Sequence, residues 1–445
     1  MSQKKTTPRE LSLQESVRLF EDGETLVLGH GAASPDALVR ELVRQKDAPE
    51  MKGKHLNLFH LIHIGDQSFL DPEMAGYLEC TTMFMSGKPI RQAVKEGRAH
   101  YMPCHFNELP ALFGTPPLDK SRFPHPTIPV DWAVIQVTPP DENGMCSLGP
   151  SSDFTLPAAR KANRILALVN DQLPYVGGDN FVPWDRIDFF VRISEPALEV
   201  PVKEPGELDF KIAEFCAPYV PDGATLQAGI GGIPDAVLRL LTDRKDLGVH
   251  TELLTPGVKF LEEKGVITGA KKGHRDGKIV GAFAMGDADF YRWMDRHPDI
   301  EMWPVDVVNS FGEIAANNRM ISINSAVEID LTGQVCAEMV GGEMYSGSGG
   351  QVDFVRGAHA SKGGVSIIAL PSTAKGGAIS KIVPYLGHGN GVTTLRNDID
   401  VIVTEFGAAE LRGLTELQRA KALIGIAHPD HRETLEAALY SRLKR

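Results

Sequence analysis

Short apolar runs alternate with segments of helical periodicity along the whole chain. Apolar runs bounded by turn residues predict buried strands, whereas apolar residues at three- and four-residue steps predict helices with one buried face. Strands are expected at 26–28, His55–Leu61, Trp132–Val137, Ile165–Val169, Phe189–Ile193, 225–228, Val249–Leu254, Ile279–Ala284, Val305–Val308, Val327–Ile329, Val365–Leu370 and Val401–Val403. Helices are expected at 35–42, Phe210–Tyr219, 234–244, Asp287–Arg296, Leu417–Ile426 and His431–Leu443. This alternation is typical of an α/β fold with mainly parallel sheets covered by helices.

The sequence also repeats at an offset of 200 residues: position 22 corresponds to 222, and position 149 corresponds to 349. Asp22-Gly23-Glu24-Thr25-Leu26 returns as Asp222-Gly223-Ala224-Thr225-Leu226, and Gly149 with Asp153-Phe154 returns as Gly349 with Asp353-Phe354. We therefore predict two tandem, similar, open α/β domains, residues 1–195 and 208–445, joined by a linker at 196–207 that is rich in proline and charge. The active site is expected in the interdomain cleft.

Composition and charge narrow the class of protein. The 445 residues are 42% apolar and 23% charged, as in ordinary soluble proteins. A net charge of −12 disfavours nucleic acid or an anionic membrane as a general partner. No apolar stretch follows the first residues, so no signal peptide is expected, and no run reaches the ~18 apolar residues of a membrane span. Five scattered cysteines indicate reduced thiols in a cytoplasmic protein. A homodimer or homotetramer is expected because closed symmetric assemblies are common.

Three glycine-rich segments could approach a ligand. Gly29-His30-Gly31 and Gly229-Ile230-Gly231 each join a strand to a helix, and a helix N-terminus can bind phosphate. Neither completes a dinucleotide fingerprint or a Walker loop, so a tight turn that binds nothing is equally compatible. The segment 341–354 holds many glycines, which let backbone N–H groups face a ligand closely. A flexible loop is the alternative there.

Candidate side chains for chemistry are few. Glu252 comes near the end of an expected strand, where ligands of open α/β sheets lie, although a solvated surface carboxylate is the commoner case. His60 and His63 lack a nearby carboxylate or cysteine that would complete a metal site, so no metal is expected. They are interpreted as independent residues, and His30 and His63 are candidates to contact a substrate. The spacing of a serine-hydrolase elbow is absent.

Several motifs, in order along nearly the whole chain, resemble the acetyl-CoA hydrolase/transferase family. These are class I coenzyme A transferases, such as the 4-hydroxybutyrate, butyrate and acetate CoA-transferases. The motifs are Gly229-Ile230-Gly231-Gly232-Ile233-Pro234-Asp235-Ala236-Val237, His250-Thr251-Glu252, the run 323–335, the run 347–354, and 403–413 followed by Ala427-His428-Pro429.

The resemblance implies roles for individual residues. Glu252 corresponds to the glutamate that forms a thioester with CoA, and Asn309 with the Gly350 N–H resembles the pair that receives the thioester carbonyl. The turn Gly229-Ile230-Gly231 resembles the wall beside that glutamate. The further residues expected to contact CoA are Gly349, Gln351, Lys375 and Lys381, although the two lysines could equally be surface residues. The chain departs from many relatives, which have Asn-His-Pro at 309–311 and His-Gly-Asp-Ser near 177–180.

The expected function is transfer of CoA from an acyl-CoA to a short-chain carboxylate, by a ping-pong mechanism through a glutamyl-CoA thioester. CoA would be a substrate, and no permanently bound cofactor is expected. An acyl-CoA hydrolase that uses water as acceptor is an alternative, and a non-catalytic module that binds CoA or a sugar phosphate is another. The sequence leaves acetate, butyrate, 4-hydroxybutyrate, succinate and itaconate open as acids.

Overall fold

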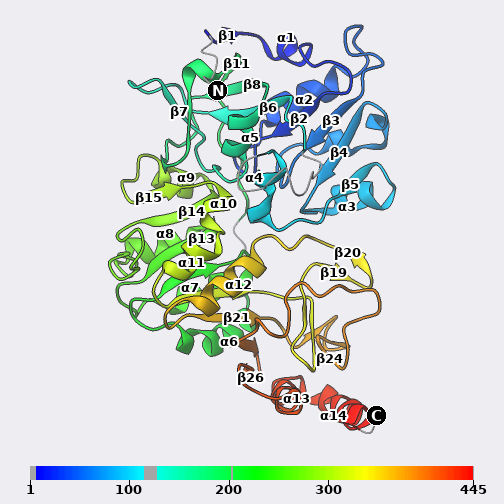
Figure 1. Ribbon diagram of the computed structural model, residues 1–445, viewed down its shortest axis with the longest axis vertical. Helices are drawn as coiled ribbons and strands as arrows, with labels where there is room; N and C mark the ends of the chain where they lie inside the picture. Colours follow the sequence, from blue (N-terminus) through cyan, green and yellow to red (C-terminus); the bar gives the residue numbers. More distant parts are fainter. Residues whose placement is uncertain (1–6, 115–127, 202–203, 444–445) are drawn as a thin grey trace. The chain divides into compact units, whose positions relative to one another are not determined.

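The structure is a computed structural model that describes residues 7–114, 128–201 and 204–443 (Figure 1). By its packing the chain divides into two units, one of Met1–Val202 with Val280–Val308, and one of Lys203–Ile279 with Asn309–Arg445. Residues 280–308 therefore group with the first unit, whereas the sequence-based boundaries assigned them to the second. Those boundaries, with the linker at 196–207, stay a prediction. Within the described residues, no helix combines the length and apolarity needed to cross a membrane.

Unit 1 is built on an eight-stranded sheet whose neighbouring strands all pair in parallel. Its order is β1 (Arg9–Glu10), β11 (Phe189–Ile193), β8 (Arg164–Asn170), β6 (Trp132–Val137), β2 (Thr25–Leu28), β3 (Leu56–Phe59), β4 (Leu78–Thr82) and β5 (Ala99–Tyr101). The unit also contains α1 (Leu13–Val17), α2 (Asp36–Arg44), α3 (Lys88–Lys95), α4 (Leu109–Leu112), α5 (Thr155–Lys161), α9 (Ala288–Met294) and α10 (Val305–Val308), the hairpin of β7 (Met145–Ser147) and β10 (Phe181–Pro183), and the strands β9 (Gly177–Gly178), β14 (Ile279–Ala284) and β15 (Ile300–Met302).

The centre of this sheet explains its apolar sequence. Every residue of β6 is buried, because a parallel strand covered on both faces has no solvent side. Trp132 begins β6 and packs edge-on against Phe20, with 5.3 Å between ring centroids. Ile135 and Val137 continue into a core shared with β8 and α5. The apolar run, interrupted only by the buried Gln136, was therefore sufficient to predict this strand at its observed bounds.

Unit 2 carries a second sheet of the same kind (Figure 1). Its strands are ordered β26 (Gly407–Glu410), β25 (Val401–Thr404), β21 (Val365–Ala369), β16 (Met320–Asn324), β12 (Thr225–Ala228) and β13 (Gly248–Leu254), and only the edge strand β26 pairs antiparallel. The helices are α6 (Glu207–Cys216), α7 (Gly232–Leu240), α8 (Pro256–Glu263), α11 (Phe311–Ala316), α12 (Gln351–Ala360), α13 (Glu416–Gly425) and α14 (Pro429–Leu443). Short strands complete the unit: β17 (Glu328–Asp330), β18 (Val335–Cys336), β19 (Met339–Val340), β20 (Glu343–Met344), β22 (Thr373–Ala374), β23 (Ile379–Ser380) and β24 (Ile382–Val383). Helix α12 packs on β16, β21 and α11.

The two sheets repeat one strand order. The run β11-β8-β6-β2-β3 in unit 1 has the same order as β25-β21-β16-β12-β13 in unit 2. Backbone details recur as well, since the Gly29 N–H donates to Val134 at 2.8 Å and the Gly229 N–H donates to Ile323 at 3.1 Å. Gly149 and Gly349 both have positive φ, 64° and 53°, which glycine adopts without strain. The predicted α/β class with mainly parallel sheets is confirmed, and the 200-residue offset is visible in the local structure.

Two of the predicted elements need correction. Val305–Val308 was expected to be a strand, but it forms helix α10, in which the Pro304 carbonyl accepts from the Val307 and Val308 amides, both at 3.0 Å. A four-residue apolar run does not distinguish a strand from a buried helical turn. The strand expected at His55–Leu61 ends at Phe59, so His60 and His63 follow the strand and do not lie on it.

Candidate active site

Glu252 lies on β13, in the part of the strand that no longer pairs with β12. The ladder between β12 and β13 joins only Thr225 to Gly248 and Leu226 to Val249, so the residues beyond Val249 are not paired with β12. Glu252 is partly buried, between the buried residues Thr251 and Leu253. It was predicted near the strand end, and β13 continues two residues further, to Leu254. The end of the ladder leaves room for a carboxylate beside the carboxyl end of β12.

Asn309 contacts this carboxylate directly. Its side chain is fully buried, and its Nδ2 donates to Glu252 Oε2 at 2.6 Å. Asn309 Oδ1 is buried and has no hydrogen-bond partner in the part of the chain that is described. The carbonyl oxygen of a side-chain amide can accept hydrogen bonds, so Asn309 Oδ1 keeps an unused capacity as an acceptor. Asn309 therefore presents a donor to Glu252 and an unused acceptor in the same place.

The segment after Asn309 is fixed by a capped helix. Ser310 is the N-cap of α11, and its hydroxyl accepts from the Glu313 N–H at 3.2 Å. The Glu313 carboxylate in turn bonds His274 at 2.7 Å and pairs with Arg275 at 3.3 Å. Burial works to raise the pKa of Glu313, but these two partners outweigh it and hold the pKa below its usual value. The start of α11 is thus tied to a neighbouring loop, which limits the movement of Asn309.

Gly350 completes the group. It is the N-cap of the ten-residue helix α12, and a Cβ atom at this position would collide with the Glu252 carboxylate and the Asn309 amide. Only glycine fits in that space. The positive end of the α12 dipole also lies beside the carboxylate and favours negative charge there. Glu252, Asn309 and Gly350, which the sequence predicted as a catalytic set, therefore lie in contact with one another in unit 2.

A pair of amides lies near the carboxyl ends of β12 and β16, and the sequence did not predict it. Gln227 on β12 and Asn324 on β16 exchange two hydrogen bonds, of 3.3 and 3.0 Å. Gln351, the first residue of α12, donates to the Ser325 carbonyl at 3.3 Å and so links the helix to the end of β16. A polar residue at the carboxyl end of an apolar strand was the available signal.

Two family domains match the chain. Residues 1–202 match the acetyl-CoA hydrolase/transferase N-terminal domain, and residues 286–439 match the acetyl-CoA hydrolase/transferase C-terminal domain. The chain belongs to the acetyl-CoA hydrolase/transferase family. The family expected from the sequence motifs is confirmed.

Relatives at 35–44% identity are CoA transferases by name, which confirms the predicted class of enzyme. The 4-hydroxybutyrate coenzyme A transferase of Clostridium kluyveri is 43% identical over 425 residues, 96% of each chain. The succinyl-CoA:acetate/propanoyl-CoA:succinate CoA transferase of Fasciola hepatica is 44% identical over 97% of this chain and 87% of its own. The solved 4-hydroxybutyrate CoA-transferase of Porphyromonas gingivalis superposes with a TM-score of 0.82, at 40% identity and 98% coverage of both chains. An acetyl-CoA hydrolase of Kluyveromyces lactis is more distant, at 26% identity over 95% of this chain and 87% of its own.

The glycine turns of this family member have defined shapes. Gly231 has a φ of 127° and is the N-cap of α7, while Ile230 is 58% exposed. The first part of the predicted ligand loop is a hairpin of β19 and β20, whose turn residues Gly341 and Gly342 both have positive φ. Gly349 precedes α12 with a φ of 53°. Contact of Gly229, Ile230, Gly231, Gly349 and Gln351 with CoA stays a prediction.

The two lysines predicted to meet CoA phosphates differ in their surroundings. Lys375 lies in the turn between β22 and β23 and is exposed. Lys381 is half-buried and donates to the Ala326 carbonyl at 3.2 Å. Burial lowers the pKa of Lys381. Its ammonium is therefore partly engaged within the fold, whereas that of Lys375 faces solvent, and a phosphate contact of either stays a prediction.

The two histidines predicted to contact substrate lie in the interior of unit 1. His30 is fully buried with Asp153 Oδ2 at 3.0 Å, and His63 is 1% exposed with Asp36 Oδ1 at 3.2 Å. Burial, together with the charges of His63 and His30, lowers the pKa of His60 to about 3, so this imidazole is neutral at pH 7. Within the described residues, no three His, Cys, Asp or Glu side chains are placed to hold a metal. A role in substrate binding stays a prediction.

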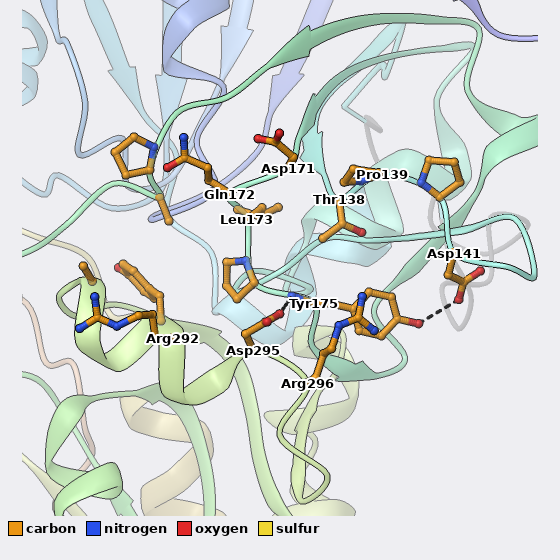
Figure 2. Close-up of a pocket in the computed structure, with 16 residues that line it drawn as sticks. Thr138, Pro139, Asp141, Asp171, Gln172, Leu173, Tyr175, Arg292, Asp295 and Arg296 are labelled. Atoms are coloured by element: carbon orange, nitrogen blue, oxygen red, sulfur yellow. Dashed lines mark hydrogen bonds between the residues drawn. The ribbon is translucent and has the colours of Figure 1, made fainter.

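Unit 1 also contains a pocket that sequence reasoning missed (Figure 2). Its volume is about 560 Å³, and it lies at the carboxyl ends of β6 and β8, with α9 on one side. The Tyr175 hydroxyl donates to Asp141 at 2.9 Å, and the Arg296 guanidinium lies 4.7 Å from the Tyr175 ring centre. None of the site residues predicted from the sequence lines this pocket.

Proposed function

We propose that this chain transfers coenzyme A from an acyl-CoA to a short-chain carboxylate through a glutamyl-CoA thioester at Glu252. The observation that carries the proposal is the contact of Glu252 with Asn309 and with the start of α12 at Gly350. A carboxylate is a recognised nucleophile in covalent catalysis. The CoA-transferase relatives, whose names include 4-hydroxybutyrate, succinate and acetate, support an acid of this size.

The reaction runs in two exchanges. The Glu252 carboxylate attacks the acyl-CoA carbonyl, the C–S bond breaks, and a mixed anhydride and CoA thiolate form. The thiolate then attacks the Glu252 carbonyl carbon of the anhydride, which releases the first acid as its carboxylate and leaves the glutamyl-CoA thioester. A second carboxylate repeats these steps in reverse and leaves as its CoA thioester. Electrons and atoms balance without ATP, a metal or a permanently bound cofactor.

Asn309 and Gly350 would serve the charge that develops on oxygen. Each exchange passes through tetrahedral intermediates, whose oxyanion needs donors that are already in place. The Asn309 Nδ2 donates to Glu252 Oε2 in the resting site, so it faces the reacting carboxyl group. The N–H at the start of α12 adds the positive end of a helix dipole. Loss of one such donor typically costs about 3 kcal/mol of transition-state stabilisation.

Chemical trapping tests this mechanism. The protein is incubated with acetyl-CoA alone and then treated with sodium borohydride, which reduces a thioester to an alcohol and leaves a free carboxylate intact. We expect loss of activity and a mass change confined to the peptide that contains His250-Thr251-Glu252. The Glu252→Ala variant, which should bind CoA and transfer none, is the control and should show no mass change. Modification at Glu313 or Glu343 would replace Glu252 as the nucleophile.

The hydrolase alternative has the support of more distant relatives. In a transferase, consumption of acyl-CoA depends on an added carboxylate and shows ping-pong kinetics. In a hydrolase, CoA is released at the same rate with and without the carboxylate. A rate that does not change over a series of added acids would therefore favour hydrolysis, and the absence of turnover would favour a module that only binds CoA.

A further inference from the structure

A second hollow lies in unit 2, at the end of the sheet opposite to Glu252. It has a volume of about 600 Å³ and is lined by residues of the loops that lead into the strands: Asp222, Gly223, Asp246, Lys271, Asn318, Arg319, Lys362 and Gly363. Arg319 directly precedes β16, and Gly223 comes two residues before β12. Glu252 lies four residues beyond Gly248, the first residue of β13, which is about 13 Å along the strand. The hollow is therefore separate from the site around Glu252.

Within the described residues, no carboxylate forms an ion pair with a cation of this hollow. Among the described residues, Lys271 and Lys362 form neither an ion pair nor a side-chain hydrogen bond. The Arg319 guanidinium donates one hydrogen bond to the Asp222 carbonyl at 2.6 Å. The two carboxylates of the hollow are engaged elsewhere. Asp222 Oδ1 accepts from the Lys245 N–H at 2.8 Å, and Asp246 Oδ1 accepts from the Thr268 hydroxyl at 3.2 Å. Three cations and two carboxylates thus line this cavity, which gives it a net positive charge in a chain whose net charge is −12.

Two glycines help to shape the cavity. Gly223 and Gly363 have φ values of 72° and 73°, and both line the hollow. A Cβ at Gly223 would meet the Lys271 side chain, and one at Gly363 would meet the Arg319 side chain. The aliphatic parts of the Lys271 and Arg319 side chains therefore lie close to the glycine backbone, where a larger residue would displace them.

The same end of the sheet has different charges in the first copy of the repeat. Arg319 precedes β16, and the register of the strands places the uncharged Val130 at the corresponding position of unit 1, where Asp131 directly precedes β6. Asp131 Oδ2 accepts from the Thr25 N–H at 2.9 Å. Glu24 pairs with Arg164 and accepts from Trp132 Nε1 at 2.7 Å. In the first copy Arg164 forms an ion pair with Glu24, whereas Lys271 and Lys362 of the second copy form no ion pair within the described residues.

We propose that this hollow, the strand-entry pocket, binds a ligand that bears phosphate groups. Lysine and arginine side chains are the usual partners of phosphate, because several N–H donors can meet several oxygens at once. The volume exceeds the needs of a single orthophosphate and is within the range of small-molecule sites. The ligand is therefore a diphosphate or a phosphorylated nucleotide. The pocket is separate from the proposed transfer site, so the two proposals stand or fall independently.

Calorimetric titration with inorganic pyrophosphate, at constant ionic strength set by chloride, tests this site. We expect one saturable site per chain in the full-length protein. The double variant Lys271→Met, Lys362→Met keeps the side-chain length and removes two charges, so affinity should fall at least tenfold. The double variant Lys271→Arg, Lys362→Arg keeps the charge and should stay within about threefold of the parent. Lys421→Met, an exposed lysine on α13, is the matched control and should bind like the parent.

Equal affinity of the parent and the methionine variant would overturn the proposal, and so would a parent that shows no saturable binding. A thermal melt of each variant reports folding, and the arginine variant keeps the test informative if the methionine variant unfolds. A parallel titration with adenosine 3′,5′-bisphosphate distinguishes the source, because tighter binding than that of pyrophosphate assigns the pocket to a nucleotide. Pyrophosphate that the methionine variant still binds, and that CoA but not pantetheine displaces, would place the phosphates in the CoA site and would contradict a separate pocket.

Discussion

The space between Glu252, Asn309 and Gly350 allows no additional heavy atom. A methyl group at Gly350 would collide with both the Glu252 carboxylate and the Asn309 amide, so one of the three must move. We expect Gly350→Ala to lower kcat/KM at least a hundredfold, because oxyanion donors act only when they are in place. Gly312→Ala is the matched control, since Gly312 on α11 has free space around its Cα. Steady-state kinetics with acetyl-CoA and a fixed acid measure both. Near-normal activity of Gly350→Ala would show that the site tolerates displacement.

Asn309 permits a second test at the same scale. Removal of its amide in Asn309→Ala should lower kcat about a hundredfold or more and leave KM for acyl-CoA nearly unchanged, because the lost donor acts in the transition state. The exposed Asn143 provides the control Asn143→Ala, which should behave like the parent. A rise in KM without a fall in kcat would instead assign Asn309 to substrate binding.

The family resemblance grouped Glu252, Asn309 and Gly350, which lie far apart in the chain, and the structure places the three in contact. Glu252 and Gly350 lie in family motifs, whereas Asn309 lies where the chain departs from many relatives, and the catalytic roles of all three stay a prediction. Asn324 lies in the motif 323–335, but the motif does not reveal its pairing with Gln227, which depends on β12 and β16 being neighbours in register. Pairing across a sheet is a long-range property, so a single chain without its topology does not reveal it.

Elements were predictable in proportion to their length and burial. The run Trp132–Val137 is buried on both faces, and its observed bounds are those predicted. Val305–Val308 was wrong because four apolar residues suit a buried helical turn as well as a strand, and the choice depends on what packs around them. The glycine-rich segment 341–354 was predicted to turn backbone N–H groups toward a ligand, with a flexible loop as the alternative. It contains the turn and second strand of one hairpin and the start of α12.

Asp235 on helix α7 predicts that the free energy of unfolding depends on pH. Burial raises the pKa of Asp235 to about 6, with a contribution from Glu204 and Asp209, while Arg239 opposes the shift. The folded state then holds this proton more tightly than the unfolded chain, so the free energy of unfolding decreases as pH rises from about 4 to about 6. Asp235→Asn removes that dependence. After allowance for solvent screening, the variant should be about 1 kcal/mol more stable at pH 7 and equal to the parent near pH 3.5.

Urea unfolding between pH 3.5 and pH 8 measures this difference, with Asp243→Asn as the control because Asp243 is an exposed residue. A stability difference that stays constant across the whole pH range would show that the asparagine acts through packing. A parent that becomes more stable between pH 4 and pH 6, relative to the variant, would reverse the sign of the argument.

At the scale of the whole molecule, the grouping of residues 280–308 with unit 1 has a measurable effect. The Ser152 and Asp153 amides both donate to the Ala282 carbonyl at 3.1 Å, and Phe283 lies 4.5 Å from the ring centre of His30. A fragment of residues 1–202 lacks these partners, so we expect it to bind a hydrophobic dye and to unfold without a cooperative transition. A fragment in which a short linker joins 1–202 to 280–308 should unfold cooperatively. Cooperative unfolding of 1–202 alone would support the boundaries drawn from the sequence.

The repeated strand order also shows which positions of the two sheets correspond. Register places Leu61 of unit 1 at the position that Glu252 has in unit 2, because Thr25 faces Asn57 as Thr225 faces Gly248. Leu61 is buried, so the first copy has an apolar side chain where the second has its carboxylate. The sequence repeat showed that two related units exist, and only the pairing of strands shows which positions correspond.

Two sheets with one strand order create a hazard during folding, since strand β2 could enter the place of β12. Repeated units are prone to such misassembly. In that arrangement Val27 would stand where Gln227 stands, and the Asn324 amide would lose both of its hydrogen bonds. A polar group deprived of its partners costs about 1 kcal/mol or more. The hydrogen bonds between Gln227 and Asn324 therefore also favour correct strand pairing, because they stabilise β12 beside β16 and would be lost if β2 took that place.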